Sequence, residues 1–300
     1  MDAIKAHGTG NDFVVLPDLD DRLELSADLV RALSDRRTGV GGDGVIRLGA
    51  PPSDQPGADV FMDYRNADGA AVEMCGNGVR VTAKLAVDHG FVTPRDGGVV
   101  QVATRAGTKA VVVHRDAAGE VEEVSVDMGA PILAPEDVPF AADDAEALVH
   151  DLDVDGTVLP VSVVSMGNPH AVTLVDDVRA APVTTLGPRV EVHPRFPAKV
   201  NAGFAEVVDR ATIRLRVWER GVGETAACGT GACAAVVALQ RRDLLDEVVA
   251  VHLPGGVLEV RHAPGGTVTM RGPATEVAAV RLADDWLAAA GAPTVRLAGA

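Results

Sequence analysis

The sequence predicts an α+β protein built from two pseudo-symmetric domains, the product of an internal duplication. In each domain we expect a mixed or antiparallel sheet wrapped around a central helix. The first observation is a repeated tetrapeptide, Cys-Gly-Asn-Gly from Cys75 and Cys-Gly-Thr-Gly from Cys228, at an offset of 153 residues. The same offset carries Asn66 onto Glu219. With 300 residues, of which 47% are hydrophobic, the chain is long enough for two cores.

A second repeat lies upstream of each tetrapeptide. The Gly-Asn turn at Asn11 returns at Asn168, 157 residues later, and a drift of four residues between the two offsets is a loop difference. We therefore expect an N-terminal domain over residues 1–125 and a C-terminal domain over residues 126–275. The tail, residues 276–300, is expected to return to the first domain. The active site is expected in a cleft between the two domains.

The elements of the first half follow from local patterns. Ile4 to Pro17 reads as strand, turn and strand, with the glycine-bearing segment Gly8-Thr9-Gly10-Asn11-Asp12 as the turn. Ser26 can cap a helix that runs to about Arg36. A further helix is expected to start at Cys75. β-type segments occupy Val60 to Asp63, Val99 to Ala103 and Lys109 to His114.

The second half repeats this order, with a helix from Cys228 to about Leu239. Strands are expected at Val121 to Met128, Val161 to Met166, Ala171 to Val175, Ile213 to Trp218 and Val257 to Arg261. Val79 to Val87 and Gly231 to Leu239 are apolar around most of the helix, which indicates helices surrounded by protein. The acidic, proline-bearing stretch Pro131 to Asp144 is the expected linker between the domains.

Composition excludes several classes of function. A net charge of −16 opposes binding to nucleic acid and to anionic membranes. The start of the chain does not resemble a signal peptide, and the least charged stretch is too short to span a bilayer. Three cysteines, an odd number, favour a reducing cytoplasm over a disulfide framework. We expect a small-molecule substrate, no metal and no nucleic-acid or membrane partner, and the oligomeric state stays open between a monomer and a homodimer.

Cys75 and Cys228 each begin a predicted helix, where unpaired backbone N–H groups and the positive end of the helix dipole favour a thiolate. The pKa of such a thiol is therefore expected to fall below the free value of about 8.5. The neighbouring glycines let backbone amides approach an anion such as a carboxylate. Two thiols related by duplication suggest that one removes a proton from a carbon while the other delivers a proton to the opposite face. The lysines lie in no evident phosphate-binding context, so we expect no pyridoxal phosphate and no other cofactor.

The motifs resemble those of the diaminopimelate epimerase family, in the family's order and across nearly the whole chain. The matching runs are Gly8 to Phe13, Tyr64 to Gly69, Met74 to Gly78, Met166 to His170, Glu219 to Gly221, Gly223 to Thr225 and Ala227 to Gly231. The resemblance implies a cofactor-independent isomerase that interconverts LL- and meso-diaminopimelate, in the synthesis of lysine and of peptidoglycan precursors.

The resemblance also implies the roles of particular residues. Cys228 matches the proton acceptor from the LL isomer and Cys75 matches the proton donor. His170 and Glu219 match positions that tune the thiols. The substrate-contacting positions are Asn11, Asn66, Gly76, Asn77, Asn168, Asn201, Glu219, Arg220, Gly229 and Thr230. One departure is Gly44, where many members of the family have glutamine.

Three alternatives remain open at this point. A proline racemase or hydroxyproline epimerase would also use two thiols at glycine turns, but its first motif typically has histidine where this chain has Asn77. A thiol redox protein would be expected to have a C-x-x-C motif, which the sequence lacks. A non-catalytic amino-acid binding protein would need the recognition groups but neither thiol.

Overall fold

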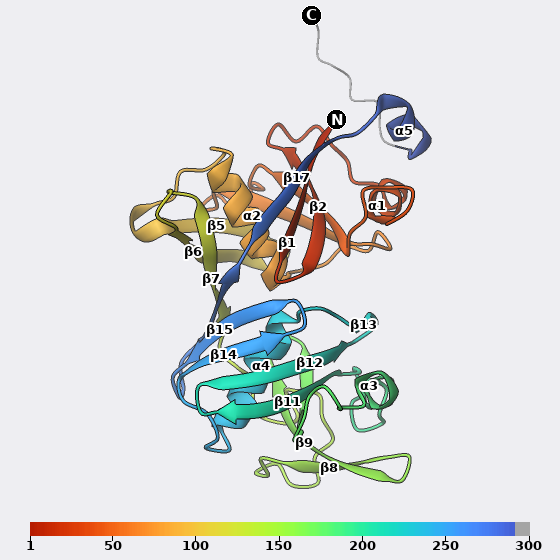
Figure 1. Ribbon diagram of the computed structural model, residues 1–300, viewed down its shortest axis with the longest axis vertical. Coiled ribbons are helices and arrows are strands. Elements are labelled where there is room, and N and C mark those ends of the chain that lie inside the picture. Colours follow the sequence, from red (N-terminus) through yellow and green to blue (C-terminus); the bar gives the residue numbers. More distant parts are fainter. Residues whose placement is uncertain (292–300) are drawn as a thin grey trace, which may run out of the picture. The chain divides into compact units, whose positions relative to one another are not determined.

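The computed structural model describes residues 1–291, and these form two compact units (Figure 1). The first unit contains Met1–Val126 together with the segment that begins at Gly272, and the second contains Asp127–Arg271. The last part of the predicted returning tail, 292–300, lies outside the described residues. No helix within the described part of the chain is long and apolar enough to span a membrane.

The first unit contains a mixed sheet and two helices of eight or more residues. Its strands are β1 (Asp2–Gly8), β2 (Asn11–Asp18), β3 (Gly44–Gly49), β4 (Val60–Asn66), β5 (Val99–Thr104), β6 (Gly107–Arg115), β7 (Val121–Gly129) and β17 (Thr275–Arg281). Its helices are α1 (Ala27–Ser34), α2 (Gly76–Asp88), the 3₁₀ turn η1 (Asp96–Gly98) and α5 (Asp284–Ala289). Ser26 caps α1 by accepting the N–H of Leu29 at 3.1 Å, as its sequence position predicts.

The second unit also contains a mixed sheet and two helices of eight or more residues. Its strands are β8 (His150–Val154), β9 (Thr157–Ser165), β10 (Pro169–Leu174), β11 (Asn201–Asp209), β12 (Thr212–Glu219), β13 (Gly223–Glu224), β14 (Val248–Leu253), β15 (Gly256–His262) and β16 (Val268–Pro273). Its helices are α3 (Val183–Glu191) and α4 (Gly229–Gln240).

The order of strand pairing is the same in the two units. In the first unit, β1 and β2 are antiparallel, β2 and β3 parallel, β3 and β4 antiparallel, β4 and β5 parallel, and β5 and β6 antiparallel. In the second, β9 to β12 followed by β14 and β15 give the same succession. The helices also fall at equivalent places, α2 between β4 and β5 and α4 between β12 and β14. The predicted mixed sheet is confirmed.

Buried helices occupy the centre of this arrangement. Eleven of the thirteen residues of α2 are buried, and α4 is buried from Ala232 to Leu239 without interruption. A helix that is apolar all round must be covered by protein on every side. Because Cys75 and Cys228 lie at the starts of these helices, the backbone position of each is fixed by the core of its unit.

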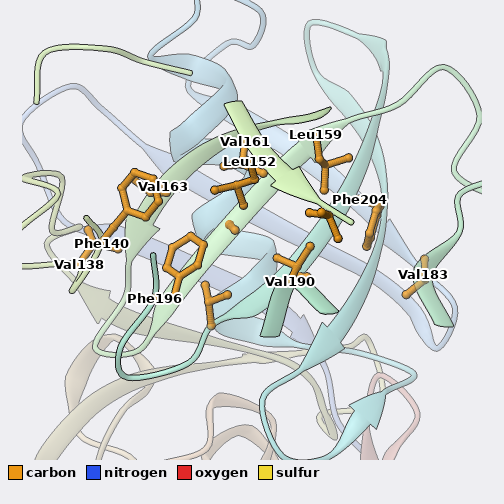
Figure 2. Packing of buried hydrophobic residues seen from close by; sticks show 14 of the residues in the cluster. Val138, Phe140, Leu152, Leu159, Val161, Val163, Val183, Val190, Phe196 and Phe204 are labelled. Carbon is orange, nitrogen blue, oxygen red and sulfur yellow. The ribbon is translucent and has the colours of Figure 1, made fainter. Parts of the chain in front are cut away.

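The core of the second unit also contains a segment that we expected to be a linker. Val138 is fully buried and Phe140 is 4% exposed, and both pack with Leu152, Val161 and Phe196 (Figure 2). The prediction that 131–144 is the linker between the domains is therefore wrong. Its acidic residues face solvent while Val138 and Phe140 belong to this core, a division that composition alone does not reveal.

Helix α3 was not anticipated, and its composition explains why. It contains Gly187 and Pro188, and it begins with β-branched residues, all of which have low helix propensity. Packing compensates: a Cβ added at Gly187 would lie 2.6 Å from the Cβ of Trp218, so glycine lets the helix approach β12 closely. Tertiary contact, rather than propensity, determines this element.

Candidate active site

The Cys75 thiol caps α2. Its Sγ accepts the backbone N–H of Gly78 at 3.4 Å, and its carbonyl accepts the N–H of Val79 at 2.8 Å. Gly76 and Asn77 are the first two helical residues, whose N–H groups have no acceptor within the helix. Cys75 is partly exposed. This turn therefore combines an accessible sulfur with helix-start donors suited to a carboxylate.

Two carboxamides lie beside the Cys75 sulfur. Asn77 Nδ2 donates to Asn11 Oδ1 at 3.1 Å, and the same oxygen lies 3.9 Å from Cys75 Sγ, which can donate its proton to it. Asn11 Nδ2 donates in turn to the carboxylate of Asp43 at 2.7 Å. The structure thus places two of the predicted site residues, Asn11 and Asn77, beside the thiol of a third, Cys75.

Asn66 is held by an unexpected partner, the hydroxyl of Tyr64, which donates to Asn66 Oδ1 at 2.9 Å. The tyrosine ring also explains the departure at Gly44. A Cβ at that position would lie 2.7 Å from Tyr64 Cε2 and 2.2 Å from the carbonyl oxygen of Arg65, so a side chain there does not fit beside this ring. In this chain Gly44 and Tyr64 form one arrangement that orients Asn66.

The Cys228 thiol caps α4 in the same way, accepting the N–H of Gly231 at 3.4 Å. Gly229 and Thr230 are the first residues of that helix. Unlike Cys75, Cys228 is buried, with 4% of its surface exposed. The prediction of a lowered pKa is wrong for this thiol: burial and the carboxylate of Glu219 raise the pKa of Cys228 well above its usual value. The Thr230 hydroxyl and the Gly231 N–H lower the pKa of Cys228 by a smaller amount. The effect of burial is therefore larger than the effect of the helix start here.

Two polar side chains adjoin the Cys228 sulfur. Thr230 Oγ1 lies 3.6 Å from Sγ, and the hydroxyl can donate to a thiolate or accept from a thiol. Glu219, at the end of β12, accepts a hydrogen bond from the hydroxyl of Thr225. A thiolate formed beside this carboxylate is a stronger base than a free one, because the carboxylate raises the pKa of the conjugate thiol.

The loop after Glu219 is fixed by two buried polar residues. Asn201, 2% exposed, accepts the N–H of Arg220 at 2.9 Å and donates to the carbonyl of Pro169 at 2.9 Å. Glu191 accepts the N–H of Gly221 at 3.1 Å and the indole N–H of Trp218 at 2.9 Å. Asn201 and Arg220 were predicted together, and the structure joins them.

His170 is fully enclosed in the second unit and interacts with Asn168 Oδ1 through Nε2 at 3.1 Å. Burial, with a smaller contribution from the Arg220 cation, lowers the pKa of His170 to about 3. The imidazole is therefore neutral near pH 7, and it acts through hydrogen bonding and shape rather than charge. His170, Asn168 and Arg220 are three predicted site residues, and the structure places them near one another.

Sequence reasoning missed Tyr64, Arg80 and Glu191. Tyr64 lies inside a recognised motif and Arg80 lies two residues after one, but neither residue type by itself indicates a hydrogen bond to a nearby asparagine. Glu191 stands outside the motifs, in a helix that local propensity did not predict. A buried acid three residues before a proline-rich turn gives no distinctive signal.

The sequence matches a known protein family over most of its length. The model of the family described as "Diaminopimelate epimerase" matches residues 3–134 and 162–277. A diaminopimelate epimerase of Pseudomonas entomophila is 47% identical over 276 residues, covering 91% of this chain and 95% of that protein. One from Thioalkalivibrio sulfidiphilus is 50% identical over 275 residues, with the same shares.

Solved structures show the same fold at much lower identity. A probable proline racemase from Agrobacterium radiobacter K84 has a TM-score of 0.67 at 17% identity, covering 95% of this chain and 93% of that one. A hydroxyproline epimerase from Agrobacterium vitis has a TM-score of 0.65 at 16% identity, covering 94% and 90%. These two resemblances concern the fold alone, whereas the matches in sequence extend through both cysteine turns, and by that measure the chain belongs to the diaminopimelate epimerase family.

Proposed function

We propose that this chain interconverts LL- and meso-diaminopimelate by two-base proton transfer at the α carbon. Inversion of a carbon needs a base that removes a proton from one face and an acid that supplies one to the other. The observation that supports this reaction most directly is the repeat of one thiol at the start of one buried helix in each unit. The reaction belongs to lysine and peptidoglycan-precursor synthesis.

In this proposal Cys228 is the proton acceptor from the LL isomer and Cys75 is the proton donor. The amide oxygen that Cys75 faces accepts from a protonated thiol, which supports Cys75 as the donor. Burial and Glu219 favour the protonated form of Cys228, so its thiolate must form before it accepts the substrate's proton, and that thiolate is then a stronger base than a free one. In the reverse direction the two exchange roles, as microscopic reversibility requires.

The substrate's charges determine the rest of the proposed site. The reacting carboxylate is held by the helix-start N–H groups of Gly76, Asn77, Gly229 and Thr230, which also stabilise charge that develops on deprotonation. The distal amino-acid group is held by Asn11, Asn66, Asn168, Asn201, Glu219 and Arg220. A ligand that lacks the distal carboxylate leaves the polar groups that recognise it unpaired, and a site built to hydrogen-bond a substrate group rejects the analogue without it.

A reducing compartment suits this chemistry, because the described cysteines are not joined in a disulfide and the reaction needs two of them as thiols. Disulfide formation or oxidation of either site cysteine would remove its proton-carrying group. We therefore propose that the enzyme works in the cytoplasm.

The test is proton exchange in heavy water with a panel of amino acids. LL-diaminopimelate should give the meso isomer with deuterium at the inverted carbon, without added pyridoxal phosphate, metal or nicotinamide. Lysine should react far more slowly, and proline and hydroxyproline should not exchange. Deuterium entering proline faster than diaminopimelate would favour the racemase alternative. Binding without any exchange would favour a binding protein.

A further inference from the structure

Arg80 is a fully buried cation one turn into α2, behind the Cys75 cap. Its Nη2 donates to Asn77 Oδ1 at 3.0 Å and to the hydroxyl of Thr9 at 2.9 Å, and its Nε donates to the carbonyl of Pro273 at 3.4 Å. A charge removed from water is costly unless nearby groups compensate it. Such a residue so close to a reacting group needs an explanation beyond packing.

The guanidinium determines which end of the Asn77 amide faces it. Arginine has only donors, so it must meet the oxygen of that carboxamide, and the Nδ2 of Asn77 must point the other way. That nitrogen requires an acceptor, which is Asn11 Oδ1. The orientation of the first amide therefore fixes the orientation of the second.

The other end of this chain of amides has the opposite constraint. Asn11 Nδ2 donates to Asp43, and an ionised carboxylate has only acceptors. Asp43 is itself held by an ion pair with Arg36 at 2.8 Å. Arg80, which can only donate, lies at one end of this chain, and the Asp43 carboxylate, which only accepts, lies at the other. The two carboxamides between them can therefore be oriented in only one way. As a result Asn11 presents oxygen, not nitrogen, to Cys75 Sγ.

We propose that Arg80 is a positioning residue that fixes the amide orientations of Asn77 and Asn11, so that the Cys75 half presents an acceptor to the protonated thiol. This inference rests on the proposed function and deepens it, because it explains why Cys75 is the proton donor.

The sequence around the turn fits this role. Gly8 leaves the space that the guanidinium fills, since a Cβ there would lie 3.2 Å from Arg80 Nη2 and 3.0 Å from the carbonyl oxygen of Asn77. The repeat offset of 153 residues carries Asn77 onto Thr230 and Arg80 onto Cys233. A threonine hydroxyl rotates freely and has no amide polarity to fix, so the second half needs no cation at this position.

A double-mutant cycle on kcat/KM tests the inference. Arg80→Met should lower kcat/KM by about 10- to 100-fold, the range for losing a hydrogen bond from a charged group. In an Asn77→Thr background the same change should cost less than about threefold, because Arg80 then has no amide to orient. Full additivity of the two changes would show that Arg80 acts through something other than Asn77, and would overturn the proposal.

Two further variants test whether Arg80 acts by orienting Asn77 or by holding the β1–β2 turn in place. Thr9→Val removes the hydrogen bond to the β1–β2 turn and leaves the Asn77 contact in place, so its effect on kcat/KM should be well below that of Arg80→Met. An equal effect would contradict the proposal. Cys233→Ala, at the matching position of α4, is the control and should change kcat/KM by less than about twofold. If Arg80→Met does not fold, Arg80→Lys replaces it in the cycle. Arg80→Lys should lower kcat/KM by a smaller factor than is expected for Arg80→Met, because the ammonium keeps the charge but does not reproduce the planar guanidinium.

A measurement without substrate keeps this test independent of the proposed reaction. In the native protein the side-chain NH2 protons of Asn77 and Asn11 should be protected from hydrogen exchange, as seen by NMR with labelled asparagine. In Arg80→Met that protection should be lost while the backbone amides of α2 keep theirs. Unchanged side-chain protection would refute the role of Arg80 even in an active enzyme. If the native protein shows the protection but no epimerisation, only the proposed function fails.

Discussion

The turns at Cys75 and Cys228 share one geometry: each sulfur accepts the N–H of the third residue onward at 3.4 Å, and each begins a buried helix at an equivalent place in the strand order. Their surroundings differ. The sulfur of Cys75 is partly exposed and faces an amide oxygen, with a buried guanidinium behind. The sulfur of Cys228 is buried beside a carboxylate and a hydroxyl.

The comparison separates what the backbone provides from what the side chains provide. A duplicated backbone places two sulfurs in the same local frame, so geometry alone does not assign one as acid and the other as base. The pKa of Cys228 is raised mainly by burial and secondly by Glu219, which overrides the helix start. The proton affinity of Cys228 is therefore determined by the protein that covers it and by Glu219, rather than by the backbone turn that both halves share.

Replacing either thiol is the strongest test of this division of labour. Cys75→Ala and Cys228→Ala should each lower kcat by about 10²- to 10⁴-fold or more, because each removes a proton carrier. Substrate affinity should change little, as measured by calorimetry. Cys233→Ala is the control and should stay active. An active single variant would mean that one thiol performs both transfers.

The glycines that follow the thiols should differ in their tolerance of a methyl group. A Cβ at Gly231 would lie 3.2 Å from the sulfur of Cys228, whereas a Cβ at Gly78 would lie 3.2 Å from the sulfur of Met62 and 3.5 Å from the Cβ of Cys75. Gly231→Ala should therefore displace the reacting sulfur and lower kcat by about tenfold or more.

Gly78→Ala should have a smaller effect on kcat, because it presses on a flexible methionine side chain. Steady-state kinetics of both variants, with thermal unfolding to confirm the fold, gives the comparison. A larger loss of kcat in Gly78→Ala than in Gly231→Ala would show that the Cys75 turn is the more constrained one.

Removing the carboxylate beside Cys228 should shift its titration. In a Cys75→Ser, Cys233→Ala background, the pH dependence of iodoacetamide alkylation reports the remaining thiol. Glu219→Gln should move the midpoint to lower pH, since Glu219 raises the pKa of Cys228. The midpoint should still exceed about 8.5, because burial is the larger cause. Glu224→Gln is the matched control and should not move it; an unmoved midpoint in Glu219→Gln would refute the assigned cause.

The two halves should also differ, by a smaller amount, in how far acid lowers the free energy of unfolding. The offset of 157 residues carries Phe13 onto His170, so only the second unit has an ionisable side chain there. The pKa of His170 is about 3 when folded and about 6.5 when unfolded, so the unfolded state binds more protons between these values. The free energy of unfolding should then fall by about 1.4 kcal/mol per pH unit as the pH drops below 6.5.

Denaturant titrations from pH 7 to pH 4 check this slope. His170→Gln should flatten it, whereas Phe13→Leu should lower stability equally at every pH. A slope that survives His170→Gln would assign the acid sensitivity to other groups.

Sequence alone predicted the repeat, the mixed sheet and the helix starts at the cysteines, because short motifs with glycine spacing are local signals. It failed where burial decides. The pKa of Cys228 depends on how much protein covers it, and the buried core residues of 131–144 belong to a stretch whose composition is that of a linker. The side-chain partners Tyr64 and Arg80 were missed for a related reason: a hydrogen bond between two side chains depends on rotamers that no pattern of residue types specifies.

Strand β17 has a consequence for how the chain is made. It pairs with β1, from Asp2 opposite Arg281 to His7 opposite Thr275, and Leu282 donates its N–H to the carbonyl of Met1 at 2.8 Å. During synthesis β1 must therefore wait for β17, while the strands from β8 to β15 are all made earlier than β17. Co-translational folding usually proceeds from the N-terminal domain. Here the second unit can be completed first, and until β17 is made β1 has an open edge that can pair with other chains.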